Sequence, residues 1–218
     1  MESIVHTAES AWRSKNLLYK ALDEKDEDLI DLVHQHLTND PVVQALSMGD
    51  LIKPSTKKQS LEYIEKLSKC YLAVGIYLPV PEDSEVAAGD EAKSRDYAKA
   101  DNKPILIGYV CLSPVPPSMS HHRCSNIAIC LRGDYQNRGY GSEAINWVVD
   151  WGFRHANLHR IGIGAVSFND RAIKLYQKLG FTIEGRQRER ILWDRKWYDL
   201  VDMSMLEQEW ETLRASKE

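Results

Sequence analysis

Apolar residues recur along this chain with two different periods. Some stretches alternate apolar and polar positions, which is typical of strands, and others repeat every three to four residues, which is typical of amphipathic helices. The strand-like stretches are 16–22, 71–78, 105–112, 125–131, 160–168, 182–193 and 197–206. The helix-like stretches are 26–37, 60–68, 142–153 and 169–179, with a short helical turn within 40–54 and a helical tail at 207–213.

The order of these elements predicts one mixed sheet. The two strands on either side of the turn at 194–196 should pair antiparallel as a hairpin. A single strand–helix–strand unit, residues 125–168, interrupts the series near the middle of the chain. This mixture predicts an α/β (α+β) fold. In the helix at 60–68, the spacing of Leu61, Ile64 and Leu67 places them on one face.

Composition favours one globular domain spanning residues 1–218. The chain has 218 residues, of which 43% are hydrophobic and 28% charged, and this is enough to bury a core of moderate size. Residues 79–104 differ, because prolines and charged residues replace large apolar ones there. We expect an exposed insertion, and a passive surface loop is favoured over a functional lid. Residues 207–218 should form a C-terminal tail.

Charge and cysteine usage argue against several classes of protein. The net charge of −4 disfavours a nucleic-acid partner, since such proteins carry a basic stripe. No apolar stretch approaches the ~20 residues needed to cross a membrane, and the first residues do not form a secretory signal. The four cysteines form no CxxC pair, which indicates reduced thiols in a cytoplasmic or nuclear protein. His121 and His122 lack Cys or carboxylate partners at useful spacing, so we expect no metal site.

Two glycines lie between the strand that ends at Leu131 and the helix at 142–153. Glycine lets the backbone adopt positive φ or approach a ligand closely, and the N–H groups at a helix start favour a phosphate group. Neither the P-loop string nor the dinucleotide fingerprint is present, and a turn that only caps the helix is the alternative. The candidate phosphate-binding residues are Gln136, Asn137, Arg138, Gly139, Tyr140, Gly141 and Ser142.

The helix at 169–179 has clear end signals. Asn169 suits the N-cap, and Gly180 suits the position after the last helical residue. Ala172, Ile173 and Tyr176 follow helical spacing, so this face should pack inward. Tyr176 would then be a part-buried phenol whose hydroxyl group needs a partner.

Two motifs in this order resemble the GNAT superfamily of acyl-CoA N-acyltransferases: Gln136-x-x-Gly139-x-Gly141, and Asn169-x-x-Ala172-x-x-Leu175-Tyr176-x-x-x-Gly180-Phe181. The resemblance covers residues 105–206. Its later part is similar to bacterial spermidine acetyltransferases and ribosomal-protein alanine acetyltransferases. It implies a GNAT-like, mostly antiparallel central sheet that is flanked by helices and has splayed middle strands, with acetyl-CoA as the acyl donor.

The resemblance also implies roles for individual residues. The glycine turn would hold the pyrophosphate of acetyl-CoA, and the pantetheine arm would pair with the backbone of Ile129, Cys130 and Leu131. Tyr176 would act as the general acid at the leaving sulfur, unless it is only a core tyrosine. Asn169 would contact the pantetheine or the adjoining helix, and this role can coexist with capping.

The expected function is transfer of an acetyl group directly from acetyl-CoA to a primary amine, without an acyl-enzyme. A small molecule such as a polyamine is the expected acceptor, because an acidic protein can attract cations. A protein N-terminal or lysine acetyltransferase is the alternative, and a non-catalytic acyl-CoA-binding sensor is an alternative of another class. The general base stays open among Glu184, Asp134 and His122. The oligomeric state is also open, a homodimer included.

Overall fold

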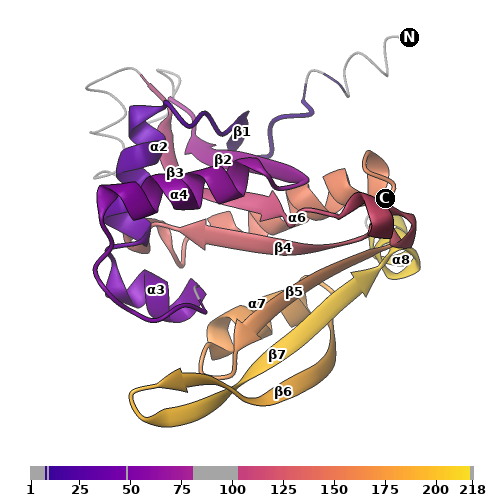
Figure 1. The fold of residues 1–218 in the computed structure, drawn as a ribbon. Coiled ribbons are helices and arrows are strands. Elements are labelled where there is room, and N and C mark those ends of the chain that lie inside the picture. Colours follow the sequence, from indigo (N-terminus) through magenta and orange to yellow (C-terminus); the bar gives the residue numbers. More distant parts are fainter. Residues whose placement is uncertain (1–7, 9, 48, 81–102, 217–218) are drawn as a thin grey trace.

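One seven-stranded sheet runs through the molecule (Figure 1). The computed structural model describes residues 8, 10–47, 49–80 and 103–216. Neighbouring strands follow the order β1-β2-β3-β4-β5-β7-β6, and every pair is antiparallel except β4 with β5. The strands are β1 (Leu18–Ala21), β2 (Leu72–Leu78), β3 (Ile105–Leu112), β4 (Cys124–Leu131), β5 (Arg160–Val166), β6 (Thr182–Trp193) and β7 (Lys196–Leu206).

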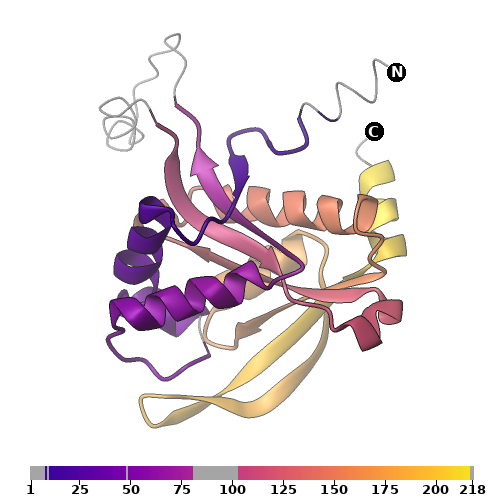
Figure 2. The same cartoon turned by 45° about the horizontal axis from the view of Figure 1, so that its top comes forward.

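Helices cover both faces of this sheet, and Figure 2 shows α4 and α6 on opposite sides of it. The first group is α2 (Glu27–Asp31), the π-helix η1 (Leu32–Leu37), α3 (Pro41–Ser47) and α4 (Lys57–Ser68). The second group is α6 (Tyr140–Arg154), α7 (Asp170–Lys178) and α8 (Glu207–Ala215). Two 3₁₀ turns, η2 (Pro117–His122) and η3 (Gly133–Tyr135), flank β4. The predicted α/β (α+β) class, with a mostly antiparallel sheet between helices, is confirmed.

Each face of the sheet has its own hydrophobic core. One core joins α6 and α7 to the sheet, and in it Trp147 stacks on Tyr19 with ring centroids 3.9 Å apart. The other core joins η1, α3 and α4 to β2, β3 and β4. The two layers therefore hold the sheet between them, as the separate apolar faces of the predicted helices require.

The apolar face predicted for the helix at 60–68 is only partly buried. Ile64 and Leu67 are buried, but the side chain of Leu61 is 40% exposed. Ser60 is buried instead, and its hydroxyl group lies 3.0 Å from His34 Nδ1 and 3.0 Å from Thr38 Oγ1. Because this polar network satisfies the buried hydroxyl group, the helix can turn Ser60 inward and Leu61 outward.

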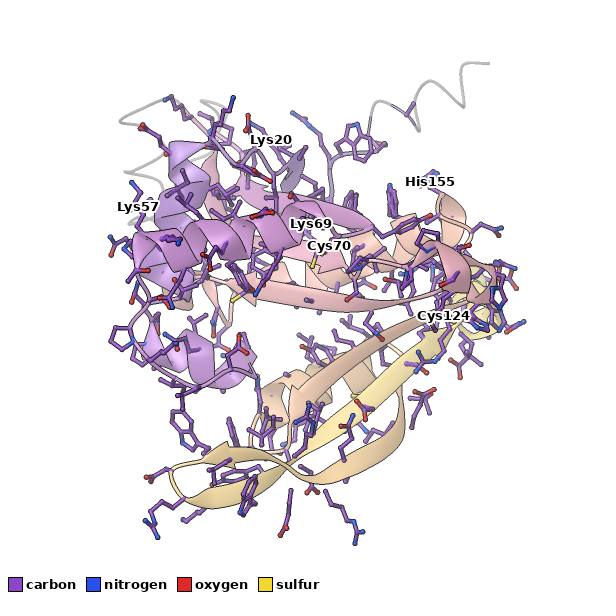
Figure 3. All side chains as sticks on the ribbon, in the orientation of Figure 1. Lys20, Lys57, Lys69, Cys70, Cys124 and His155 are labelled. Atoms are coloured by element: carbon purple, nitrogen blue, oxygen red, sulfur yellow. The ribbon has the colours of Figure 1, made fainter. Side chains whose placement is uncertain are left out.

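The middle strands splay apart. β4 and β5 pair only over their first three residues, from Cys124 opposite Arg160 to Asn126 opposite Gly162. Beyond that point the two strands diverge, and the gap between them narrows toward the labelled Cys124 (Figure 3). The splay that the family resemblance implied is therefore present in the fold.

The register of β4 against β3 decides which backbone groups of β4 face this gap. Arg132 N–H donates to Ile107 O, and Ser113 N–H donates to Asn126 O, so the even-numbered residues of β4 pair with β3. In an antiparallel ladder the alternate residues turn their N–H and C=O groups the other way. The backbone groups of Ile127, Ile129 and Leu131 thus face the gap.

Two predicted segments differ from the structure at their edges. The helix predicted from residue 142 begins at Tyr140, so Ser142 lies within its first turn. Of the predicted insertion at 79–104, residues 81–102 lie outside the described part of the chain. Among the described residues, no helix combines the length and the apolar character that a membrane crossing requires.

Candidate functional site

A cavity of about 410 Å³ occupies the gap between β4 and β5. Its walls come from both faces of the sheet, because they include Gly139 and Ile145 around the start of α6 and also Ser47 of α3 and Tyr109 of β3. The cavity therefore reaches through the sheet at the splay. Of the predicted site residues it brings together Ile129, Leu131, Gln136, Asn137, Gly139, Gly141, Ser142, Asn169 and Tyr176.

The loop ahead of α6 presents backbone N–H groups to this cavity. Gly139 is the N-cap of α6 with φ 88°, a left-handed conformation that favours glycine, and no side chain caps the helix. The N–H groups of the first turn have no partner within the helix. A Cβ atom at Gly139 would meet nothing within 4 Å, so the space in front of the loop is open. An anion is the ligand that such a helix start favours.

Arg171 ties this loop to α7. Its guanidinium donates to Asn137 Oδ1 at 2.7 Å and to Gln136 Oε1 at 2.8 Å. Gln136 in turn donates from Nε2 to Leu131 O at 3.0 Å, which joins the loop to the end of β4. Arg171 also lines the cavity, so a positive charge adjoins the loop that favours anions.

Arg171 is not among the site residues predicted from the sequence. One signal could have pointed to it, since an arginine in the first turn of a helix opposes the helix dipole and so suggests another role. Its partners lie 34 and 35 residues away in the chain, so no local pattern shows the contact.

Cys130 does not join the other predicted residues. Its side chain is 2% exposed and packs in the core beneath α3 and α4. Its backbone pairs with Tyr109 of β3, whereas the backbone of Ile129 faces the cavity. Burial raises the pKa of the Cys130 thiol to about 12, and burial likewise raises the pKa of Cys111 to about 12. Both thiols are therefore neutral and weakly nucleophilic near pH 7.

Tyr176 is buried in the wall of the cavity, with 8% of its residue surface exposed. Burial raises its pKa to about 12, and Arg171 partly offsets this shift. The phenol is therefore protonated across the physiological pH range. Asn169 caps α7 by accepting from Ala172 N–H, and its amide donates to Leu46 O at 3.2 Å. This residue thus connects α7 to α3 across the cavity.

Arg138 and Tyr140 do not line the cavity. The exposed Arg138 guanidinium lies 5.6 Å from the ring centroid of Tyr135, and Tyr140 packs partly buried against the core beneath α6. These two side chains therefore contribute to the loop's packing rather than to the cavity wall.

The three candidates for the general base also lie outside this cavity. Asp134 pairs with Arg132 at 3.0 Å, and His122 lies against His121 with ring centroids 3.9 Å apart. Glu184 is held by Arg160, and this hydrogen bond lowers the pKa of its carboxyl group. Within residues 8, 10–47, 49–80 and 103–216, no three His, Cys, Asp or Glu side chains group in a way that could hold a metal ion.

Known proteins resemble part of this chain in sequence. The chain is 35% identical over 77 residues to an uncharacterized N-acetyltransferase, YnaD, of Bacillus subtilis, a match that covers 35% of this chain and 45% of that protein. It is 29% identical over 86 residues to a spermidine N(1)-acetyltransferase of Vibrio cholerae, which covers 39% of this chain and 50% of that protein. The chain thus spans about half the length of the curated relatives it matches.

Solved structures resemble nearly the whole chain. A spermidine N-acetyltransferase from Vibrio cholerae in complex with CoA and spermine superposes with a TM-score of 0.67 at 19% identity, over 91% of this chain and 99% of that one. An acetyltransferase of the GNAT family from Bacillus anthracis superposes with a TM-score of 0.65 at 20% identity, over 90% and 98%. At these identities the likeness concerns the fold.

The family model described as "Acetyltransferase (GNAT) family" matches residues 61–181, which is more than half of the chain. The matched stretch contains β4, the loop ahead of α6 and all of α7, the elements that form most of the cavity. This protein therefore belongs to the GNAT family of acetyltransferases.

Proposed function

We propose that this protein is an N-acetyltransferase that uses acetyl-CoA to acetylate a primary amine by direct transfer. The observation that carries the proposal is the cavity at the splay, which has the uncapped start of α6 at one end and the Tyr176 phenol in its wall. Membership of the family supports acetyl-CoA as the donor.

The residues of the cavity fit the parts of acetyl-CoA. The N–H groups at the start of α6, together with the Arg171 guanidinium, would hold the pyrophosphate. The backbone N–H and C=O groups of Ile129 would pair with an amide of the pantetheine arm, as an added strand pairs with an open sheet edge. We infer that Gln136 and Asn137 act by shaping the loop, since their side-chain oxygens already accept from Arg171.

Acetyl-CoA supplies an activated acyl group when bound, and the chain's own residues do the rest. A backbone N–H of β4 that faces the gap would donate to the thioester oxygen as that oxygen gains negative charge. The Tyr176 hydroxyl would donate to the leaving sulfur. Because burial keeps the Cys111 and Cys130 thiols protonated, the amine rather than a cysteine would attack the thioester carbon. The C–N bond would form, the C–S bond would break, and the proton lost by the nitrogen would pass through water to the departing thiolate.

The acceptor that we propose is a small cationic amine, with polyamines as the first class to test. Spermidine acetyltransferases among the relatives support this choice, and a putative ribosomal N-acetyltransferase of Bacillus subtilis, 26% identical over 90 residues, gives peptides as the other class. The acidic net charge of −4 favours cationic acceptors of either class.

The test is release of free thiol from acetyl-CoA in the presence of single amines. We expect turnover with polyamines and little with peptides that carry a free N-terminus or a lysine. Turnover with peptides alone would move the acceptor to the protein class. Acetyl-CoA binding by calorimetry without thiol release for any amine would contradict an enzyme and would favour an acyl-CoA sensor.

A further inference from the structure

A second cavity lies on the sheet face that α6, α7 and α8 leave uncovered. Its volume is about 500 Å³, and it extends over β5, β7 and β6. It shares Ile163 and Gly164 with the cavity at the splay, so the two cavities meet at β5. Figure 1 shows α2 and α4 over the other half of the sheet on this side, whereas β7 and β6 face the viewer directly.

Two glycines leave open space around one carboxylate in this second cavity. Asp202 of β7 has Gly164 of β5 as one cross-strand neighbour and Gly185 of β6 as the other. Side chains at directly opposite positions stand about 5 Å apart on the same face, so larger residues there would cover Asp202. A Cβ atom at Gly185 would meet nothing within 4 Å, and one at Gly164 would lie 3.8 Å from Asp202 Oδ1. The carboxylate therefore stands in a hollow.

The two carboxylates of this cavity differ in their partners. Glu184 forms an ion pair with Arg160 and accepts a hydrogen bond from Ser204 Oγ at 2.7 Å. Asp202 is half-buried, and its one hydrogen bond from a described side chain comes from a neutral amide, Gln187 Nε2, at 2.8 Å. In the described part of the chain, no lysine or arginine forms an ion pair with Asp202. Its negative charge is thus the uncompensated one in the cavity.

We propose that this second cavity binds the acceptor and that Asp202 holds an ammonium group other than the one that reacts. The inference rests on the proposed function. An amine must lose its proton before it attacks, because alkylamines have a pKa near ~10.4 and arrive charged. A carboxylate stabilises the charged form of an amine, so the nitrogen that reacts cannot be the one that Asp202 holds. An acceptor that neutralises Asp202 must therefore carry a second cationic nitrogen, as diamines and polyamines do.

Geometry assigns different roles to the residues around this acceptor. Gly164 and Ile163 adjoin both cavities, and Asp202 lies directly opposite Gly164, so the chain of methylenes would run from Asp202 past β5 into the cavity at the splay, where the reacting nitrogen would lie. Glu184 would shape the cavity rather than hold the ammonium group, since its ion pair with Arg160 forms part of the cavity wall. Asp202 is then the carboxylate whose charge is left for the acceptor. Asp202 would thereby set specificity for the length of the acceptor.

The test compares Asp202→Asn with wild type. Asparagine keeps the shape and the oxygen that accepts from Gln187, and it removes only the charge. We expect KM for spermidine to rise roughly 10- to 100-fold, as for loss of a charge-assisted hydrogen bond. KM for butylamine, a monoamine, and KM for acetyl-CoA should stay within about twofold. Glu211→Gln on the exposed side of α8 removes an equal charge from the opposite face and should change none of these values.

A second variant and a second readout keep the outcomes separable. Gly185→Val fits a strand and fills the hollow, so it should also raise KM for spermidine while leaving KM for acetyl-CoA unchanged. Calorimetry with spermidine alone reports binding without turnover. Binding that depends on Asp202 in a protein with no turnover would sustain this site and defeat the proposed function. Release of thiol from acetyl-CoA with spermidine as acceptor that is equal in wild type, Asp202→Asn and Gly185→Val would overturn this site and leave the function standing. Absence of both turnover and binding of spermidine would also overturn it.

Discussion

Replacing Tyr176 by phenylalanine isolates one hydroxyl group of the candidate site. The ring stays in place, because it packs in the core beneath α7 with Phe181 6.3 Å away, centroid to centroid. Among the described residues, the hydroxyl group has no hydrogen-bond partner from the protein. Its removal should therefore change the unfolding free energy at pH 7 by less than about 1 kcal/mol. Loss of activity in this variant would then report chemistry rather than folding.

The size of the expected loss follows from the pKa of this phenol. Burial raises it to about 12, whereas a thiol has a pKa near ~8.5, so full proton transfer to the leaving sulfur is uphill by roughly 5 kcal/mol. Tyr176 should then act mainly as a hydrogen-bond donor to a charged group, worth about 1.5–3 kcal/mol. We expect kcat to fall roughly 10- to 150-fold in Tyr176→Phe, and KM for acetyl-CoA to change by less than about threefold.

The pH dependence of stability gives an independent check on the same residue. A folded-state pKa of about 12, above an unfolded value near ~10, means that the folded protein binds the proton more tightly. This contribution to stability is fully present below pH ~10 and is lost as pH rises toward 12. Denaturant unfolding between pH 9 and 11 should show a smaller loss of stability in Tyr176→Phe than in wild type. The reasoning is refuted if kcat is unchanged in the variant, or if kcat falls only because CoA binding or folding is lost.

Three further substitutions test the loop ahead of α6, its contact with Arg171 and the end of α7. Gly139→Asp should weaken CoA binding more than Gly139→Asn, since both residues must adopt φ 88° but only aspartate places a negative charge where we propose that the pyrophosphate binds. Equal affinities in calorimetry would contradict the phosphate assignment. Arg171→Met should raise KM for acetyl-CoA about tenfold and leave kcat within about twofold, because it removes a cation and both hydrogen bonds from α7 to the loop. An unchanged KM would contradict a role for Arg171 in binding acetyl-CoA. Gly180→Ala should lower the unfolding free energy by about 1–3 kcal/mol, because Gly180 has φ 100° and a Cβ would lie 2.4 Å from Leu213 Cδ1. Thermal denaturation beside Gly49→Ala, whose added Cβ meets nothing within 4 Å, is the control, and equal Tm values in the two variants would contradict the strain.

Local features of the sequence determined the elements of this fold. The helix at 169–179 could be predicted because its cap and its stop are neighbours in the chain, and Asn169 and Gly180 take those positions in the structure. The strand at 105–112 matches β3 residue for residue. The glycine loop could also be located from the sequence, since the positive φ at Gly139 is a local requirement of the loop backbone that glycine meets.

Only the tertiary structure decided how these elements make a site. The splay depends on where pairing between β4 and β5 stops, and that is set by register over residues 36 positions apart, such as Asn126 and Gly162. The register between β4 and β3 turned the backbone of Cys130 away from the cavity and that of Ile129 toward it. The hollow at Asp202 arises from glycines on two other strands, so no window of sequence contains it. Periodicity reports the face that a residue takes within its own element, whereas contacts between elements follow from packing of the whole chain.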